Sequence, residues 1–182
     1  RSKLFGLLNV SLEYRMIQGS YIPQFFDQAY DLNRVVSITN DNKTIINTKD
    51  MSVFSDYDDS WTSSGLFGSA NLNLFDIVNF TASYASMTAD TVEYNSFNSV
   101  LYINTDNIPK LSAANAFYRR NNDKNPFDFA NPSENTVMGY RVGYEMSKGV
   151  SLIWEYSEFY RDDGTGKLEP VKQTKIETAF SF

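Results

Sequence analysis

The sequence contains no cysteine and no histidine among its 182 residues. The missing cysteines exclude disulfides, thiol nucleophiles and thiolate zinc sites, and the missing histidines remove the commonest general base of enzymes. The short motif Gly164-Thr165-Gly166-Lys167 lacks the rest of a phosphate-binding loop, so it is interpreted as an ordinary loop. We therefore expect a protein that is not an enzyme and that uses no cofactor and no metal centre.

The chain also lacks an excess of basic residues and a long apolar run. Its formal net charge of -6 argues against nucleic acid as a partner, because nucleic-acid-binding proteins present a basic face. No stretch approaches the roughly 20 apolar residues of a membrane-spanning helix, although a membrane β-barrel would not need one. The first residues do not form a signal peptide. We expect either that a leader has been removed or that the chain is a segment of a longer protein.

What the sequence does contain is a repeated alternation of apolar and polar residues with a period of two, which predicts β-strands. The first example is 7–16, where Leu8, Val10 and Leu12 alternate with Asn9, Ser11 and Glu13. The same reasoning gives about eight strands in a single all-β domain spanning 1–182, at 7–16, 68–74, 78–86, 98–105, 111–120, 138–146, 150–157 and 175–182.

The predicted connections alternate between short and long. Short turns are expected near 75–77, 105–110 and 147–149, and long polar loops near 18–64, 88–96, 121–135 and 162–169. Short turns at one rim and long loops at the other are typical of an up-and-down barrel in an outer membrane, with the long loops outside the cell. Within the first loop, 22–34 predicts a short helix and 35–46 a projecting hairpin around Asn40-Asp41-Asn42.

The two faces of the predicted strands differ in a way that favours a membrane barrel. Most polar-face residues are Ser, Asn, Thr, Gly or Ala, which suit a narrow, curved interior better than a water-facing surface. The charged exceptions carry both signs, and we expect them inside the barrel: Glu13, Arg15, Arg141, Glu145, Glu155, Lys175 and Glu177. If the first and last strands close the barrel, Glu13 and Arg15 approach Lys175 and Glu177. These charges would form either a network that fills the interior or an ion-conducting constellation in a wider pore.

The opposite face is aliphatic in the middle of the strands and aromatic towards their ends. This distribution predicts an apolar band between two aromatic girdles, formed by Tyr14, Phe80, Tyr84, Tyr144, Tyr156 and Phe180. Alternation alone would also fit a soluble antiparallel sandwich or a ligand-binding barrel, and a soluble binding module stays open as an alternative.

The last eight residues, Lys175 to Phe182, carry a resemblance to a known family. Ile176, Thr178, Phe180 and Phe182 alternate after a polar Lys175, and the chain ends on aromatic–any–aromatic. This pattern resembles the C-terminal signal of bacterial outer-membrane β-barrel proteins, although Glu177 stands where a Gly is common. The chain as a whole looks like barrels of the Bacteroidetes–Chlorobi kind. The resemblance implies assembly by the barrel-assembly machinery and a location in the outer membrane.

Three loop features suggest further contacts. The acidic clusters at 56–61 and at Asp162-Asp163 have the carboxylates that hard cations prefer and would suit a cation shared with lipopolysaccharide, although we favour solvated loops. Asp90-Thr91-Val92 resembles the three-residue O-glycosylation motif of Bacteroidetes.

The sequence thus predicts a transmembrane antiparallel up-and-down β-barrel that acts through long outer loops as a structural or partner-binding protein. The alternatives are that the chain supplies the C-terminal strands of a larger porin-like channel for passive solute diffusion, or that it is a soluble module. The expected partners are outer-membrane lipid, lipopolysaccharide, the assembly machinery and other envelope proteins.

Overall fold

The computed structural model describes residues 2–4, 6–19, 35–40, 43–48, 62–89, 92–162 and 167–181, and the secondary structure in these ranges consists of strands. The strands are β1 (Ser2–Leu4), β2 (Leu8–Gln18), β3 (Val35–Asn40), β4 (Lys43–Thr48), β5 (Thr62–Leu74), β6 (Val78–Ala89), β7 (Val92–Ile103), β8 (Leu111–Asp123), β9 (Thr136–Ser147), β10 (Val150–Asp162) and β11 (Leu168–Phe180). In these ranges there is no helix of the length and apolarity needed to cross a membrane.

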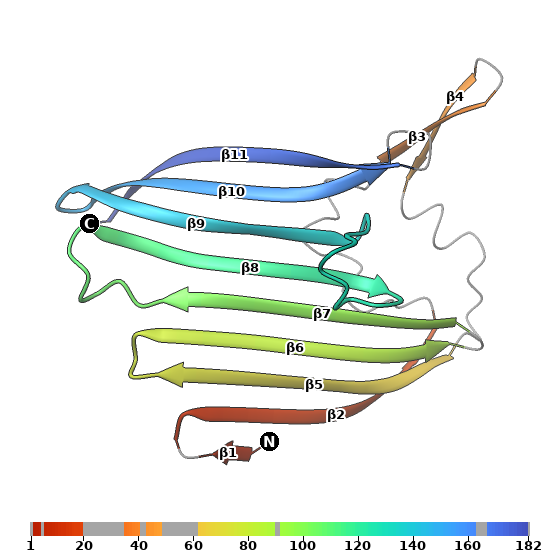
Figure 1. Cartoon of the computed structure of the whole chain (residues 1–182), viewed down its shortest axis with the longest axis horizontal. Helices are drawn as coiled ribbons and strands as arrows, with labels where there is room; N and C mark the ends of the chain where they lie inside the picture. The colour runs from red at the N-terminus through yellow and green to blue at the C-terminus, as the bar shows by residue number, and fades with distance from the viewer. Residues whose placement is uncertain are drawn as a thin grey trace.

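All strands except β3 and β4 form one sheet in the order β1-β2-β5-β6-β7-β8-β9-β10-β11 (Figure 1). Each strand pairs antiparallel with its neighbours in this order, and eight of them form an up-and-down succession. The all-β antiparallel prediction is therefore confirmed. Strand β1 was not predicted, because a strand of three residues before a turn at Gly6 (φ 70°) leaves too short a pattern to recognise.

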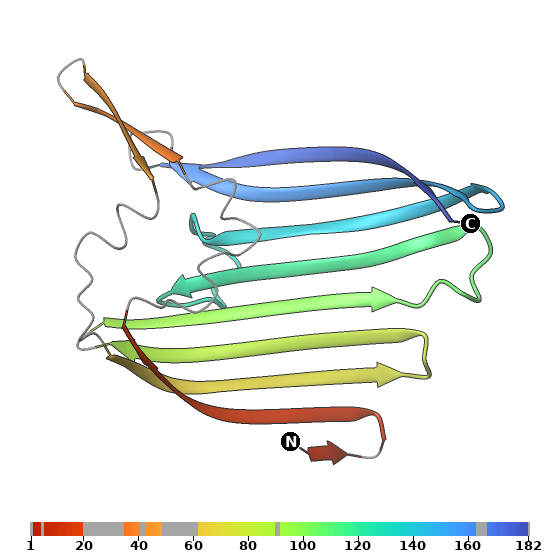
Figure 2. The same cartoon turned by 180° about the vertical axis from the view of Figure 1, so that it is seen from behind.

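Strands β3 and β4 form a separate two-stranded hairpin, with Ile38 paired to Ile45. It extends beyond the ends of the main strands in Figures 1 and 2. The predicted projecting hairpin is confirmed, whereas the predicted helix at 22–34 lies outside the described residues.

The turns at one end of the sheet are short and locally stabilised, as predicted. Between β5 and β6, Phe75 and Asp76 have φ of 53° and 55°. The Asn73 side chain holds this turn, because its Oδ1 accepts from the Asp76 N–H at 3.1 Å and its Nδ2 donates to Asp76 Oδ1 at 3.0 Å. Between β9 and β10, Gly149 supplies a φ of 77° that other residues adopt at a cost. We call this end of the strands the short-turn end.

The connections 19–61, 124–135 and 163–167 join the strands at their opposite end, which we call the loop end. The predicted long loop at 88–96 is wrong, because β6 continues to Ala89 and β7 begins at Val92, with those two residues paired. Small and polar residues such as Ser86 and Asn95 extend the ladder there, which masked the strand ends in the sequence. Asp90 and Thr91 lie outside the described residues.

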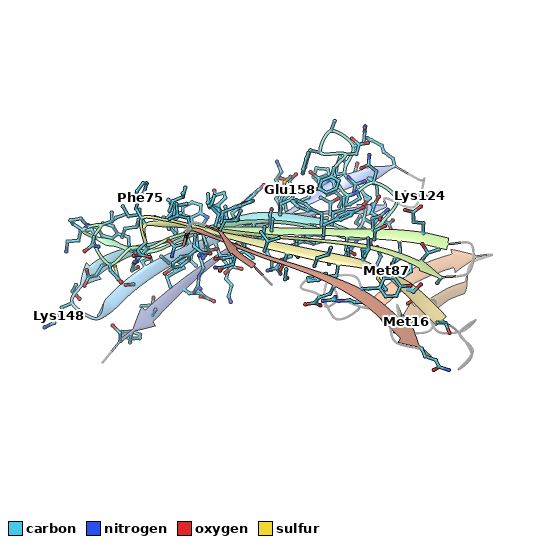
Figure 3. The ribbon with its side chains drawn as sticks, turned by 90° about the horizontal axis from the view of Figure 1, so that it is seen from below. Met16, Phe75, Met87, Lys124, Lys148 and Glu158 are labelled. Atoms are coloured by element: carbon cyan, nitrogen blue, oxygen red, sulfur yellow. The ribbon has the colours of Figure 1, made fainter. Side chains whose placement is uncertain are left out.

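The predicted closure into a barrel is also corrected, because the sheet stays open, with β1 and β11 at opposite edges among the described strands. Seen edge-on in Figure 3, the sheet is twisted and does not curl back on itself. Curvature in sheets comes largely from bulges and glycine kinks. Among the described strands, the register shifts where β7 pairs with β8, β8 with β9 and β9 with β10, whereas β2, β5 and β6 keep an unbroken register.

The two faces separate as predicted. The polar face carries Ser11, Asn71, Thr81, Asn98, Asn115, Arg141, Glu155 and Lys175, and the apolar face carries Leu12, Leu66, Phe80, Leu101, Ala116, Val142, Trp154 and Ile176. No other described element covers the middle of the apolar face, where Leu12 is 71% exposed, Val142 45% and Trp154 52%. A soluble sandwich would bury these side chains against a second layer.

A small hydrophobic core lies on the polar face near the loop end. Val137 and Phe159 are buried there, and Phe117 and Val171 pack against them. The Phe117 ring covers Gly139, because a Cβ on that glycine would come within 2.8 Å of the ring. This cluster was not predicted, because Val137, Phe159 and Val171 lie beyond the alternating stretches that defined the polar face in the sequence.

Candidate functional site: the two faces and the loop between β8 and β9

The polar face over β2, β5 and β6 is an uncharged hydrogen-bonding surface along most of its length. Ser11 Oγ and Ser69 Oγ lie 2.7 Å apart across β2 and β5. The Asn71 amide donates to Asn79 Oδ1 at 3.0 Å and to Thr81 Oγ1 at 2.7 Å. Short side chains reach only their cross-strand neighbours, so these groups satisfy one another without projecting far from the sheet.

The polar face over β9, β10 and β11 carries charges of alternating sign. Arg141 Nη2 donates to Glu177 Oε2 at 3.0 Å, and Arg141 Nε lies 3.8 Å from Glu155 Oε2. Glu177 also pairs with Lys175 through its other oxygen. The register places Arg141, Glu155 and Lys175 directly opposite one another on consecutive strands. Opposite charges in this arrangement attract each other, which holds the cluster against the polar face of the sheet.

The seven predicted lumen charges all lie on the polar face, where six of them form two groups and Glu145 stands apart. Glu13 and Arg15 pair with each other at 3.1 Å, and the Arg15 guanidinium lies 3.6 Å from the centre of the Phe67 ring. The expected approach of these two residues to Lys175 and Glu177 is wrong, because β2 and β11 lie near opposite edges of the open sheet. Glu145, opposite Ser151, stands about 13 Å along β9 from Arg141, at about 3.3 Å per residue.

A groove of about 610 Å³ runs along the polar face beside the charge cluster. It is lined by Val100, Tyr102, Asn115, Phe117, Arg119, Val137, Arg141, Glu155, Ser157 and Gln173. The Arg119 guanidinium lies 5.3 Å from the centre of the Phe117 ring, which places a cation beside an aromatic wall. The groove therefore combines rings, amides and charges of both signs, a surface suited to contact with hydrated polar solutes.

On the other side of the sheet, all six predicted girdle residues lie on the apolar face. Phe80, Tyr144 and Phe180 lie towards the short-turn end, and Tyr14, Tyr84 and Tyr156 towards the loop end. Tyr140, which the girdle prediction omitted, stacks on Tyr156 with the ring centres 5.3 Å apart. Two aromatic rows thus border a middle that is aliphatic except for Trp154.

Polar residues on the same face begin directly beyond the loop-end aromatic row, and we call them the polar rim: Ser86, Asn95, Arg120, Thr136, Glu158 and Lys172. Each oxygen of Glu158 accepts a hydrogen bond at 2.7 Å, one from Tyr156 and one from Tyr160. Tyrosine hydroxyls turned towards a polar rim mark the place where the apolar surface ends.

The loop 124–135 folds back over the polar rim, and Arg120 anchors it. The Arg120 side chain is only 6% exposed; Nε donates to Asp123 Oδ2 at 2.9 Å. Its Nη1 donates to the carbonyls of Asp128 at 2.6 Å and Asn131 at 3.0 Å. Burial alone would raise the pKa of Asp123, but hydrogen bonds from Arg120, Ser133 and the Asn125 N–H outweigh burial and hold this pKa below its usual value.

Aromatic contacts hold the same loop against the sheet. Phe127 packs on Tyr84 and Phe97, with ring centres 5.3 Å and 4.8 Å apart, and Phe129 meets Tyr118 edge-on at 5.0 Å. The Tyr118 hydroxyl donates to the Pro126 carbonyl at 3.2 Å. Sequence reasoning assigned 121–135 as a polar loop and missed this structure. The aromatic spacing in Pro126-Phe127-Asp128-Phe129 was the signal that could have revealed it.

The predicted assembly signal lies on an edge strand. Ile176, Thr178 and Phe180 alternate along the apolar face of β11, and Ile176 and Phe180 are both well exposed. The strand ends at Phe180, and Phe182 lies outside the described residues. Whether the assembly machinery reads this strand stays a prediction.

The predicted cation sites lie mostly outside the described residues. Residues 56–61 and Asp163 lie outside the described ranges, and of Asp162 the structure describes only its place in β10. Among the side chains that are described, no acidic cluster has the arrangement of a metal site.

Comparison with protein-family models, with curated protein sequences and with solved structures found no match to this chain.

Proposed function

We propose that this chain forms part of the wall of a β-barrel in a bacterial outer membrane, with its apolar face against lipid and its polar face towards an aqueous interior. The observation that carries the proposal is the uncovered apolar face bordered by two aromatic rows. This distribution is typical of transmembrane barrels. The C-terminal resemblance of Ile176, Thr178 and Phe180 to the outer-membrane assembly signal supports the same location.

The size of the uncovered face argues against residence in water. Tyr144, Trp154 and Phe180 are each more than half exposed, which leaves roughly 300 Å² of surface on these three aromatic side chains alone. Soluble monomers rarely expose apolar patches beyond about 300–600 Å² in total. The aliphatic side chains between the rings take this face past that range. Lipid would cover it without a second protein layer.

The open sheet favours a porin-like wall over a small filled cylinder. Eight strands that close leave little more than room for side chains, whereas a wider wall leaves an aqueous lumen. Here the edge strands stay apart, and the polar face has both a groove and a charge cluster. The supported role is non-enzymatic passage of small hydrophilic solutes, with lipopolysaccharide and the barrel-assembly machinery as expected partners.

Refolding into lipid vesicles tests the proposal. The full chain is expected to require detergent or lipid, to migrate differently before and after boiling, and to resist protease along its strands but not in its loops. Conductance across a planar bilayer then tests passage of solutes. A monodisperse protein in plain buffer that does not bind vesicles would contradict membrane residence. Vesicle insertion without stable conductance would instead favour the structural role.

A second role, binding of another envelope protein, is favoured by the β3–β4 hairpin. This hairpin pairs only within itself among the described residues and extends beyond the sheet (Figure 1). Deletion of 35–48 should leave vesicle insertion intact and remove co-purification of any such partner. Unchanged co-purification would argue against this role.

A further inference from the structure

The loop 124–135 changes the polarity of one part of the polar rim. Over β10 and β11 the rim is open, with Glu158 and Lys172 opposite each other. Over β7, β8 and β9 the rim residues Asn95, Arg120 and Thr136 are only 6%, 5% and 2% exposed. The loop contributes to this burial, because its carbonyls accept from Arg120, and the Lys124 carbonyl accepts from Asn95 at 3.2 Å.

The loop replaces these buried polar groups at the surface with two uncovered rings. Phe127 is 45% exposed and Phe129 is 63% exposed. Phe127 packs on Tyr84 of the loop-end aromatic row, and Phe129 meets Tyr118 of the same face edge-on, so both rings continue the apolar face and do not project away from it. In Figure 3, Lys124 and Glu158 lie at the same end of the sheet, on the side opposite Met87 of the polar face. The loop therefore lies on the apolar side.

We infer that loop 124–135 is a membrane-interface contact, whose Phe127 and Phe129 rest in the outer leaflet where the acyl chains meet the headgroups. The inference rests on the proposed function and deepens it, since it assigns lipid to a loop that would otherwise be counted among those facing the medium. It also implies that the lipid-facing surface reaches further up the wall at β6 to β9 than at β10 and β11.

Two observations favour lipid over a protein partner. The exposed rings belong to phenylalanine, which has no polar tip to satisfy, and they are continuous with the apolar rows of β6, β7 and β8. The loop is also fixed from beneath, because the buried Arg120 side chain binds Asp123 and two loop carbonyls. A loop held flat against a wall presents a smooth apolar edge to lipid, whereas partner recognition usually uses a loop that projects.

Tryptophan fluorescence in vesicles with brominated lipids tests the inference, because bromine quenches a tryptophan only on contact. Trp61→Phe leaves Trp154 as the reporter of the apolar face. In the background Trp61→Phe/Trp154→Phe, Phe129→Trp reports on the loop, and Gln173→Trp reports on the polar face. Lipids brominated near the headgroup and near the chain end separate shallow from deep contact.

The expected result is strong quenching of Trp154 by the deep bromines, strong quenching of the Phe129→Trp variant by the shallow bromines, and little quenching of the Gln173→Trp variant. An unquenched Phe129→Trp variant beside a quenched Trp154 would overturn the loop inference and leave the membrane wall intact. An unquenched Trp154 would overturn both. If Phe129→Trp does not insert, Phe127→Trp carries the same test, with the same two outcomes.

Discussion

Placing an arginine on the apolar face in the middle of the wall gives the sharpest test of how the sheet is oriented. Trp154 lies midway along β10 between Val150, where the strand begins, and Glu158 at the polar rim. At about 3.3 Å per residue it is roughly 13 Å along the strand from each, or roughly 9 Å in depth for a strand tilted by about 45°. Its cross-strand neighbour Val142 is therefore near the bilayer midplane.

Val142→Arg should destabilise the inserted protein by about 2–4 kcal/mol, the range for arginine at the midplane of a barrel wall. Gln173→Arg is the matched control, since it adds the same charge to an exposed position on the polar face of β11 and should change stability by less than about 0.5 kcal/mol. The native Arg141 offers a second comparison with Val142→Arg, because it is the preceding residue and its side chain is paired on the polar face.

Denaturant titration of the protein in phosphatidylcholine vesicles, followed by far-UV circular dichroism, measures both free energies of unfolding. Equal and small changes for the two variants would refute the assignment of the apolar face to lipid. In water, a 45% exposed valine would tolerate arginine at almost no cost. A large loss for Gln173→Arg and none for Val142→Arg would mean that the wall is inside out.

Three further outcomes are expected. Arg120→Met should weaken the packing of loop 124–135 against the sheet by about 3–5 kcal/mol, because it leaves the nearly buried Asp123 carboxylate without its cation. Faster amide exchange confined to the loop would show this loss, and unchanged exchange would contradict the anchoring role. Because the pKa of Asp123 is lowered in the folded protein, the ionised carboxylate stabilises the loop fully above the ordinary aspartate pKa of about 3.9, and this stabilisation is lost as the pH falls through the lower folded pKa. Proteolysis of the loop should therefore become faster in acid, and Asp123→Asn should abolish this dependence on pH. Gly139→Ala should destabilise the sheet by about 1–3 kcal/mol, because the new Cβ would clash with the backbone carbonyl of Tyr156 and would lie 2.8 Å from the Phe117 ring. Phe117→Leu in the same chain should recover only the part of the loss that comes from the ring, and an unchanged stability of Gly139→Ala in denaturant titration would contradict this close approach.

Strand existence and strand faces could be predicted because alternation is a local property. Leu12, Val142 and Trp154 lie on the expected face, since the period of two fixes the side of each residue once a strand forms. Strand ends were less predictable. The ladder of β6 and β7 continues through Ser86 and Asn95, residues that are as common in loops as in strands. The described residues of the loop expected at 88–96, namely 88–89 and 92–96, are therefore in fact paired strand.

The candidate site was predicted in its parts but not in its assembly. The charged residues were assigned to the correct face, yet the grouping of Arg141 with Glu177, apart from Glu13 and Arg15, depends on which strands are neighbours. The loop contacts of Arg120, Phe127 and Phe129 link positions on different elements, and no pattern of fixed period connects them.

By itself, the sequence determined an all-β chain with one apolar and one polar side to each strand, because alternation acts between a residue and its near neighbours. Only the tertiary structure decided that the sheet stays open, that loop 124–135 lies on the apolar face, and that Val137 and Phe159 form a core on the polar face. The physical reason is that curvature, loop packing and burial depend on which distant strands meet. Those contacts are set by the whole sheet together and by no single stretch of it.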